Sequence, residues 1–318
     1  MQLFKNASYK FIEKRRTAYV VSSIAILAGI AAMIINIASL GTWVRYGVDF
    51  TGGSLIQVQF QEDVPIDELR RALGDVELTR FGGEELHEFV IRAPLEDETT
   101  PVAAVADQIE AQINSAMPGR SFDVVRTEAV GAKVGSELQT KALSAILFSF
   151  LLTLVYLAFR FEFRFGLAAI IATAHDILIT LGFLAAFRVE IALPTVAAIL
   201  TILGYSLNDT IIVFDRIREN MGKKGARKRD PIELVDDSIN ETLPRTVLTS
   251  GTTVAVLVAL LVLGGEVIRD FTIVLILGVV IGTYSSIFVA SPALIEIQSR
   301  WGMGKSREKK KRPEPATV

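Results

Sequence analysis

The chain has 318 residues, of which 51% are hydrophobic and 21% are charged, and it contains no cysteine. This hydrophobic content excludes an ordinary soluble domain, and the lack of cysteine excludes disulfides and thiolate metal sites. The formal net charge of −2 conceals a strong asymmetry, because residues 41–139 hold eight basic and eighteen acidic side chains.

Six windows are apolar and long enough to cross a bilayer as helices, which takes about 17–25 residues. They cover residues 18–40, 141–159, 166–187, 193–214, 246–264 and 271–294. A total of 22 Lys and Arg lie in the flanking segments 1–17, 160–165, 215–245 and 295–318. Basic side chains near the ends of spans stay on the cytoplasmic side. This pattern predicts cytoplasmic termini, a cytoplasmic loop at 215–245 and an external, periplasmic domain at 41–139.

The external segment 41–139 has the pattern of a small α/β domain. Strand-like and helical stretches follow the order β-α-β-β-α-β, at residues 55–60, 65–73, 76–81, 88–93, 100–116 and 122–130. Pro65 and Pro101 stand in the first turn of the two helices, where proline is favoured. This order predicts a ferredoxin-like sandwich, a fold that by itself implies no activity. His87 has no second histidine nearby, so we interpret it as structural.

The loop 215–245 and the C-terminal segment 295–318 are both basic. In the loop, Asp230 and Pro231 occupy the positions of an N-cap and a first helical residue, which predicts a short helix lying on the membrane surface. The run of Lys and Arg at 305–312 predicts a solvated tail that anchors the chain on the cytoplasmic side.

Two carboxyl groups lie deep inside predicted spans. Of 35 Asp and Glu, only Asp176 and Asp209 do so, and no Lys or Arg does. A charge at this depth costs roughly 2.5–3.5 kcal/mol and marks an ion path, a proton relay or a buried pair. The third and fourth spans are joined by a short link at 188–191, which predicts antiparallel neighbours. We therefore expect the two carboxyls to approach one another or to share a polar cavity, with His175 beside Asp176.

Arg245, at the expected cytoplasmic mouth of the fifth span, is the candidate charge partner of Asp209. Burial favours the neutral form of a carboxyl and a nearby cation favours the charged form, so a movable arginine allows proton loading and release. A polar pathway between the spans is predicted from Asn208, Thr249, Ser250, Thr283, Ser285 and Ser286. Gly278 and Gly282 predict a close approach of the sixth span to a neighbour. Two alternatives remain open: Asp209 and Arg245 form a static pair, or the carboxyl binds Na⁺.

Three segments resemble the SecF branch of the SecD/SecF family of protein-export membrane proteins, within the resistance–nodulation–division superfamily. They are GVDFTGGS at 47–54, GYSLNDTIIVFDRIREN at 204–220 and RTVLTSGTT at 245–253. Shorter matches at 174–176 and 282–286 add to a likeness that extends over essentially the whole chain. The resemblance implies six spanning helices with an external α/β domain after the first of them.

This resemblance implies a subunit of the bacterial cytoplasmic membrane that is not an enzyme and needs no cofactor. It implies SecD as partner, with the SecYEG translocon, YajC, YidC and the translocating preprotein as further contacts. The proton gradient would drive movements that assist translocation. Asp209 would bind the proton with Arg245 as its charge partner, and Asp176 is the second candidate for proton coupling. The junction between the first span and the external domain would be formed by Asp49, Phe50, Thr51, Gly52, Gly53 and Ser54.

Two other functional classes are compatible with these residues. A passive membrane scaffold would use only its small-residue helix faces, so Asp209→Asn would leave its activity intact. An intramembrane aspartyl protease would use two carboxyls on adjacent spans that share one proton. Asn208 and Asp209 lack the Gly-x-Gly-Asp context expected for such a protease, and the nearby Arg245 would disfavour the protonated form.

Overall fold

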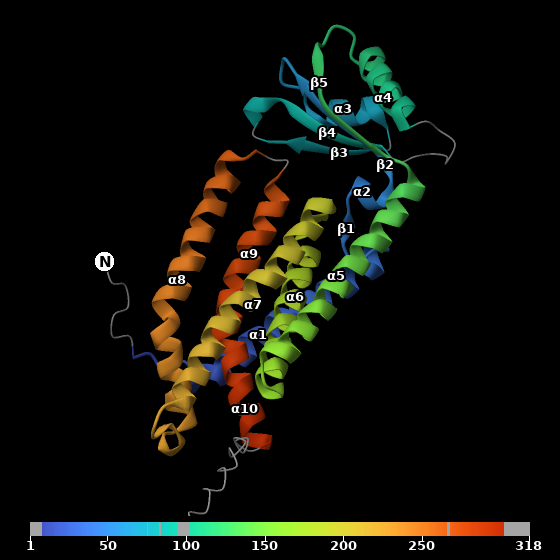
Figure 1. Cartoon of the computed structure of the whole chain (residues 1–318). Coiled ribbons are helices and arrows are strands. Elements are labelled where there is room, and N and C mark those ends of the chain that lie inside the picture. Colours follow the sequence, from blue (N-terminus) through green and yellow to red (C-terminus); the bar gives the residue numbers. More distant parts are fainter. Residues whose placement is uncertain (1–7, 75, 83, 94–101, 266–267, 302–318) are drawn as a thin grey trace, which may run out of the picture.

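The computed structural model describes residues 8–74, 76–82, 84–93, 102–265 and 268–301. Its architecture is a bundle of long helices with a small α/β domain at one end, which we call the domain end (Figure 1). Six helical segments within the described residues are long and apolar enough to cross a membrane. This confirms the six spans expected from the hydrophobic windows. The basic segment 305–312 lies outside the described residues.

The spanning helices begin with α1 (Arg15–Leu40), α5 (Ala132–Arg160), α6 (Phe163–Phe187), α7 (Leu193–Gly222) and α8 (Pro231–Leu263). The sixth consists of α9 (Arg269–Ser285), a π-helical turn (Ser286–Ala290) and α10 (Ser291–Trp301). Short 3-10 turns lie at Ile12–Lys14 and Ala226–Lys228. The inner layer consists of α6, α7 and the sixth helix, whereas α1, α5 and α8 expose most of their surface.

One helix differs from its prediction. The surface helix expected at Pro231 and the fifth span are a single helix, α8, which continues through Pro244. The Asp230 side chain caps it by accepting a hydrogen bond from the Ile232 amide at 3.0 Å. Leu234 is buried in an apolar core, so the first turns pack on protein rather than on the membrane surface. The prediction of a separate surface helix is therefore wrong. A helix can continue through an internal proline in a bundle, because neighbouring helices can supply partners for the backbone groups that lose their hydrogen bonds.

The α/β domain has the four-stranded sheet of a ferredoxin-like fold. Its elements are β2 (Gly53–Phe60), α3 (Ile66–Leu73), β3 (Glu77–Phe81), a 3-10 turn (Glu84–Leu86), β4 (Glu88–Ala93), α4 (Val102–Ala116) and β5 (Phe122–Val130). The strands lie in the order β3-β4-β2-β5 and all pairs are antiparallel, which confirms the predicted topology. Ile56, Leu69 and Phe89 belong to a core of its own beneath α3 and α4. The opposite face of the sheet is turned toward the bundle (Figure 1).

A short parallel strand pair ties the chain after α1 to the connection between α6 and α7. In this pair β1 (Arg45–Tyr46) lies beside β6 (Glu190–Ile191). The one-turn helix α2 (Val48–Thr51) follows and leads through Gly52 and Gly53 into β2. Both glycines have positive φ angles, of 73° and 121°, which glycine adopts without strain. The junction motif is therefore a tight entry into the sheet, as its two glycines predict.

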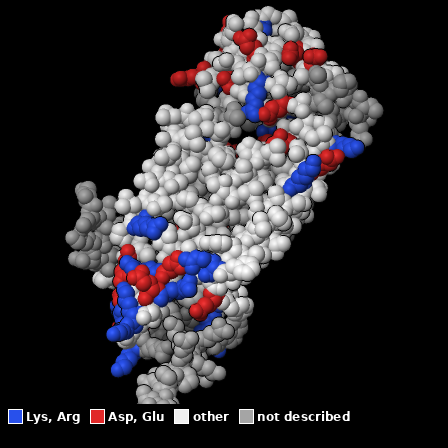
Figure 2. Space-filling model, viewed as in Figure 1, with Lys and Arg blue, Asp and Glu red and all other residues white. Residues whose placement is uncertain are grey.

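Charged side chains gather at the two ends of the molecule. In Figure 2 the visible middle of the bundle is almost free of Lys, Arg, Asp and Glu, whereas both signs of charge are dense at the end opposite the α/β domain. An uncharged belt of this kind suits the hydrocarbon core of a bilayer, which is about 30 Å thick.

Small residues bring two inner helices into close contact. A Cβ atom added to Gly278 of α9 would lie 2.1 Å from Ile202 Cγ1, and one added to Gly282 would lie 2.9 Å from Ser206 Cβ. Ile202 and Ser206 both belong to α7. The close approach predicted for the glycines of the sixth span is therefore confirmed. This contact holds α9 against the stretch of α7 that carries Asp209.

Candidate functional site

Asp209 lies on α7, and its side chain is buried in the inner layer. Its Oδ1 accepts a hydrogen bond from Thr246 Oγ1 of α8 at 2.8 Å. Its Oδ2 accepts one from Ser286 Oγ, in the π-helical turn, at 2.5 Å. Three helices therefore meet at this carboxyl, and Thr246 and Ser286 both contact it through hydroxyl groups.

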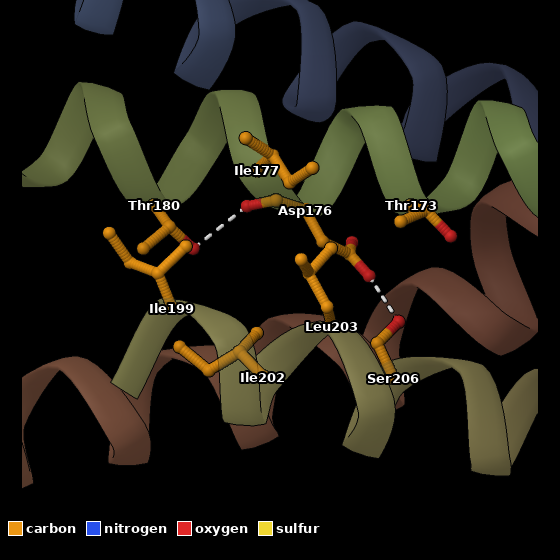
Figure 3. Close-up of a pocket in the computed structure, with 8 residues that line it drawn as sticks. All are labelled: Thr173, Asp176, Ile177, Thr180, Ile199, Ile202, Leu203 and Ser206. Atoms are coloured by element: carbon orange, nitrogen blue, oxygen red, sulfur yellow. Dashed lines mark hydrogen bonds between the residues drawn. The ribbon is translucent and has the colours of Figure 1, made fainter. Parts of the chain in front are cut away.

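Asp176 lies on α6 and is also buried. Its Oδ1 is 2.8 Å from Nδ1 of the neighbouring His175. Its Oδ2 accepts hydrogen bonds from Ser285 Oγ at 2.8 Å and from Ser206 Oγ of α7. Figure 3 shows the Ser206 side chain directed at this carboxyl. The predicted antiparallel packing of the third and fourth spans is thus present, and a serine of one helix binds the carboxyl of the other.

A small cavity lies beside Asp176 between α6 and α7 (Figure 3). Its volume is about 10 Å³, which is close to the lower limit for a single water molecule. Its polar lining comes from Asp176, Thr173, Thr180 and Ser206, and the remaining side chains are aliphatic. The Thr180 hydroxyl donates to the backbone carbonyl of Asp176 at 2.8 Å, so it does not compete for the carboxylate.

His175 connects this site to the first helix. Its Nε2 is 3.0 Å from Ser22 Oγ of α1, which in turn lies 3.3 Å from the Tyr284 hydroxyl of α9. The Tyr284 hydroxyl donates to the Ala18 carbonyl at 3.0 Å. A neutral imidazole has one donor and one acceptor nitrogen, so it can join a hydroxyl to a carboxyl. A continuous chain of hydrogen-bonding groups therefore runs from α1 to Asp176.

Ser285 and Ser286 stand side by side where the sixth helix changes from α to π geometry. Ser285 contacts Asp176 and Ser286 contacts Asp209, so one turn of helix serves both carboxyls. Each hydroxyl also has a second acceptor, the backbone carbonyl three residues earlier, at 3.1 Å and 3.0 Å respectively. A hydroxyl has one proton and two lone pairs, so a change of acceptor requires only its rotation. Helical turns of π geometry are frequent at functional sites.

Four of the predicted site residues meet in the inner layer, namely Asp176, Asp209, Ser285 and Ser286. Within the described residues the two carboxyls share no hydrogen bond, and they are linked through adjacent serines. Ser250 and Thr283 make a separate contact between α8 and α9, with their hydroxyl oxygens 2.7 Å apart. Polar side chains of the last three spans therefore meet in two places, and the predicted polar pathway stays a prediction.

Arg245, Asn208 and Thr249 lie on the outer surface of the bundle, and each is exposed in this single chain. Arg245 is near enough to Asp209 to attract it electrostatically. In the part of the chain that the structure describes, however, no ion pair within 4 Å joins the two side chains. The roles predicted for Arg245, Asn208 and Thr249 therefore stay predictions.

The junction residues 49–54 contact more of the molecule than the first span and the sheet. Asp49 Oδ2 accepts a hydrogen bond from the amide of Leu193, the first residue of α7, at 2.9 Å. Phe50 is buried. A Cβ atom added to Gly135 of α5 would lie 2.9 Å from the amide nitrogen of Gly52, so α5 packs directly on the motif. The motif thus joins α5 and α7 at the domain end.

The contacts of Ser206, Ser22 and Asp49 are not predicted from the sequence. Only Ser206 carries a signal that could have been used, because it precedes Asp209 by about one helical turn and so lies on the same side of α7. Ser22 and Asp49 carry no comparable signal, because their partners His175 and Leu193 are 153 and 144 residues away.

Known protein families match most of this chain. Residues 109–300 match the family described as "Protein export membrane protein SecD/SecF, C-terminal", and residues 37–64 match the "SecD/SecF GG Motif". The chain is 46% identical to the protein translocase subunit SecF of Gemmatimonas aurantiaca, over 95% of this chain and 90% of that protein. It is 44% identical to that of Desulfurispirillum indicum, over 90% of this chain and 91% of that protein.

Solved structures of SecDF are similar to this fold. The crystal structure of SecDF from Thermus thermophilus superimposes with a TM-score of 0.77 and 36% identity, over 94% of this chain and 40% of that one. A second SecDF structure, described as a super-membrane-facing form, gives a TM-score of 0.66 over 93% of this chain and 39% of that one. This chain therefore spans less than half of the SecDF chains that it resembles.

Proposed function

Because this chain belongs to the SecD/SecF family of protein export membrane proteins, we propose that it is the SecF-type subunit of a Sec translocase and works with a SecD-type partner. It is a multi-pass membrane protein with six candidate membrane helices. SecDF contains this fold within a chain more than twice as long. We expect the SecD-type partner to supply the part of SecDF that this chain does not match.

Exposed polar side chains within spanning helices support such a partner. On α7, Asn208 is exposed, and the face that it shares with Gly204, four residues earlier, is exposed as well. On α8, Arg245 and Thr249 are exposed with the same spacing. Ionisable and amide side chains are costly against lipid and instead face other helices or water-filled cavities. A second subunit that covers these faces would bury them, and it would bring Arg245 into a closed site beside Asp209.

The orientation follows from the basic side chains. The 22 Lys and Arg in the four flanking segments support an orientation with both termini and the loop 215–245 in the cytoplasm. The α/β domain, whose segment 41–139 carries a large acidic excess, then lies in the periplasm. In this position it stands beside a preprotein that leaves the SecYEG channel, and YajC and YidC remain candidate neighbours in the same membrane.

The proposed mechanism couples proton binding at Asp209 and Asp176 to helix movement. The observation that carries it is the set of hydroxyls around both buried carboxyls. Hydroxyls both donate and accept, so they can accommodate a charged carboxylate and a protonated acid in turn. A fixed arginine would favour only the charged form.

Protonation changes what the serines contact. When Asp209 is charged, Ser286 donates to it and holds the π-helical turn against α7. When Asp209 is protonated it no longer requires this donor, and Ser286 can return to its own backbone acceptor at 3.0 Å. Ser285 has the same choice between Asp176 and a carbonyl of α9. Each proton that enters or leaves thereby alters the contacts between α6, α7 and the sixth helix.

The two competing functional classes have less support. A protease dyad requires two carboxyls that share one proton, whereas Asp176 and Asp209 are held by different serines in the described structure. A passive scaffold needs no ionisable group in the inner layer, and burying two carboxyls there would be an uncompensated cost.

The test is Asp209→Asn in membrane vesicles that also contain the SecD-type partner and SecYEG. Preprotein translocation is followed with and without an imposed proton gradient, after assembly of the complex has been checked. We expect the gradient-dependent part to disappear, since asparagine keeps the shape of the side chain but cannot bind a proton. The matched control is Asp215→Asn on the same helix, whose carboxylate pairs with Arg160. A full gradient response in Asp209→Asn would identify the chain as a scaffold.

A further inference from the structure

The connection between α6 and α7 is held from several sides at the domain end. It joins the two helices that carry Asp176 and Asp209, and it contains strand β6. β6 pairs in parallel with β1, with Arg45 opposite Glu190. The Gly47 amide also donates to the Ile191 carbonyl at 2.9 Å. These backbone contacts fix the connection to the stretch of chain that leads into the α/β domain.

Asp49 fixes the start of α7 in addition. Its carboxylate accepts the hydrogen bond of the Leu193 amide at 2.9 Å. The first amides of a helix have no partner within the helix, and a carboxylate near them is stabilised by both the hydrogen bond and the helix dipole. Asp49 is thus an N-terminal cap that is supplied to α7 from α2, 144 residues away in the sequence.

A cluster of charges connects the same place to the sheet of the α/β domain. Glu190 of β6 forms an ion pair with Arg92 of β4, and Arg45 Nε lies 3.9 Å from the same carboxylate. Glu77 of β3 pairs with Arg45 and lies 3.8 Å from Arg92 Nη1. Asp270, at the start of α9, adds a like charge that repels Glu190, so the two arginines carry the attraction. Two strands of the sheet are therefore bound to the α6–α7 connection by alternating charges.

The fit around Glu190 is close. A Cβ atom added to Gly47 would lie 2.7 Å from Glu190 Oε1, so a larger residue at this position would displace the carboxylate. The side chains of Glu190 and Arg92 are only 14% and 19% exposed, which shields their attraction from solvent and salt. Any tilt of the domain away from the bundle would have to break this ion pair.

We infer that the α6–α7 connection is a rigid joint, through which movement of the two carboxyl-bearing helices is transmitted to the α/β domain. Asp49, Glu190 and Arg92 are its positioning residues. This inference rests on the proposed function, since it names the route from the buried carboxyls to the domain. Without the joint, the domain would keep its covalent connections to α1 and α5 and the packing of α5 on Gly52, but it would lose the ion pair and the cap that tie it to α6 and α7.

The test uses the lack of cysteine in this chain. The double variant Arg92→Cys, Glu190→Cys is prepared in the complex with its partner and compared before and after a thiol-reactive spacer bridges the two positions. Proton uptake by the vesicles and gradient-dependent translocation are measured separately. We expect the unbridged protein to take up protons while its gradient-dependent translocation is lost. Bridging should restore translocation, because it replaces the ion pair by a covalent link.

Two results would overturn the joint. One is gradient-dependent translocation that is normal in the unbridged protein, and the other is translocation that stays lost after bridging. If the proposed proton coupling itself were wrong, a different result would show it. In that case Asp209→Asn alone, in the otherwise native chain, would leave proton uptake unchanged. A second pair of variants keeps the inference testable if the cysteine protein does not assemble. Asp49→Ala should lose translocation but not proton uptake, whereas Asp49→Asn, which retains an acceptor oxygen, should keep both.

Discussion

Hydroxyl groups surround both buried carboxyls at the scale of single residues. Asp209 is bound by Thr246 and Ser286, and Asp176 accepts from two serines on the side away from His175. A static pair of Asp209 with Arg245 would place the guanidinium in direct contact with the carboxylate, and the described structure has a threonine and a serine there instead. The arrangement suits groups that change protonation.

The contribution of a single hydroxyl can be measured at Ser286. Ser286→Ala removes the donor that lies 2.5 Å from Asp209, and a hydrogen bond to a charged group contributes about 1.5–3 kcal/mol. We expect gradient-dependent translocation to fall by about tenfold or more, on the scale of 1.4 kcal/mol for each factor of ten. The matched control is Ser291→Ala, because Ser291 is equally buried but donates to a backbone carbonyl. Equal losses in both variants would contradict a specific role for Ser286.

Glu190 gives the chain a pH dependence outside the spanning helices. Burial raises the pKa of Glu190 above its ordinary value, and the guanidiniums of Arg92 and Arg45 offset only part of this rise. A raised pKa in the folded state means that the contribution to stability is full below the pKa of the unfolded chain and is lost as the pH rises through the folded pKa.

We therefore compare the free energy of unfolding of the native chain and of Glu190→Gln in detergent. As the pH rises above about 4.3, the ordinary pKa of glutamate, we expect this free energy to fall more steeply in the native chain. Denaturant unfolding at a series of pH values gives both curves, and the groups that do not interact with Glu190 cancel in their difference. Parallel curves would show that Glu190 does not titrate differently in the folded state.

At the scale of elements, the contact between α7 and α9 depends on glycine. A methyl group at Gly278 would overlap Ile202, with 2.1 Å between the added carbon and Cγ1. Overpacking of this kind costs about 1–3 kcal/mol, so Gly278→Ala should push α9 away from α7 and lower the stability of the bundle. Gly251→Ala on α8 is the control, because an added Cβ there meets nothing within 4 Å. Thermal unfolding of both variants checks this, and equal stability would refute the tight contact.

The elements differ in how well the sequence predicts them. The six spans and the strand order of the α/β domain follow from local patterns of apolar residues and turns, which adjacent residues determine. The continuity of α8 through Pro244 does not follow from such patterns. It depends on the neighbouring helices against which the side of α8 that carries Leu234 is packed. The same limit applies to the site: the intramembrane position of Asp209 is visible in the sequence, whereas the ion pair of Arg92 with Glu190 joins residues that are 98 positions apart.

At the scale of the whole molecule, the exposed polar faces of α7 and α8 predict where the partner binds. A photoactivatable crosslinker attached to the cysteine of Thr249→Cys should react with the SecD-type chain, because Thr249 lies on the same helix face as Arg245. Val262→Cys is the control on the same helix, because Val262 is 74% exposed and lies on a different side of α8. Adducts are identified by mass spectrometry. Lipid adducts alone at both positions would exclude this face as the interface.

The α/β domain interrupts the helical bundle and has a core that contains none of the residues of the bundle cores. Its first and last strands, β2 and β5, are neighbours in the sheet, and α5 follows β5 while packing on Gly52. Folding of this domain therefore brings the end of the first membrane helix next to the start of the second. Closing so long a loop costs conformational entropy, and the sheet supplies the compensating contacts. During biogenesis, folding of this domain would thereby favour the packing of the first helix against the helices that are made after it.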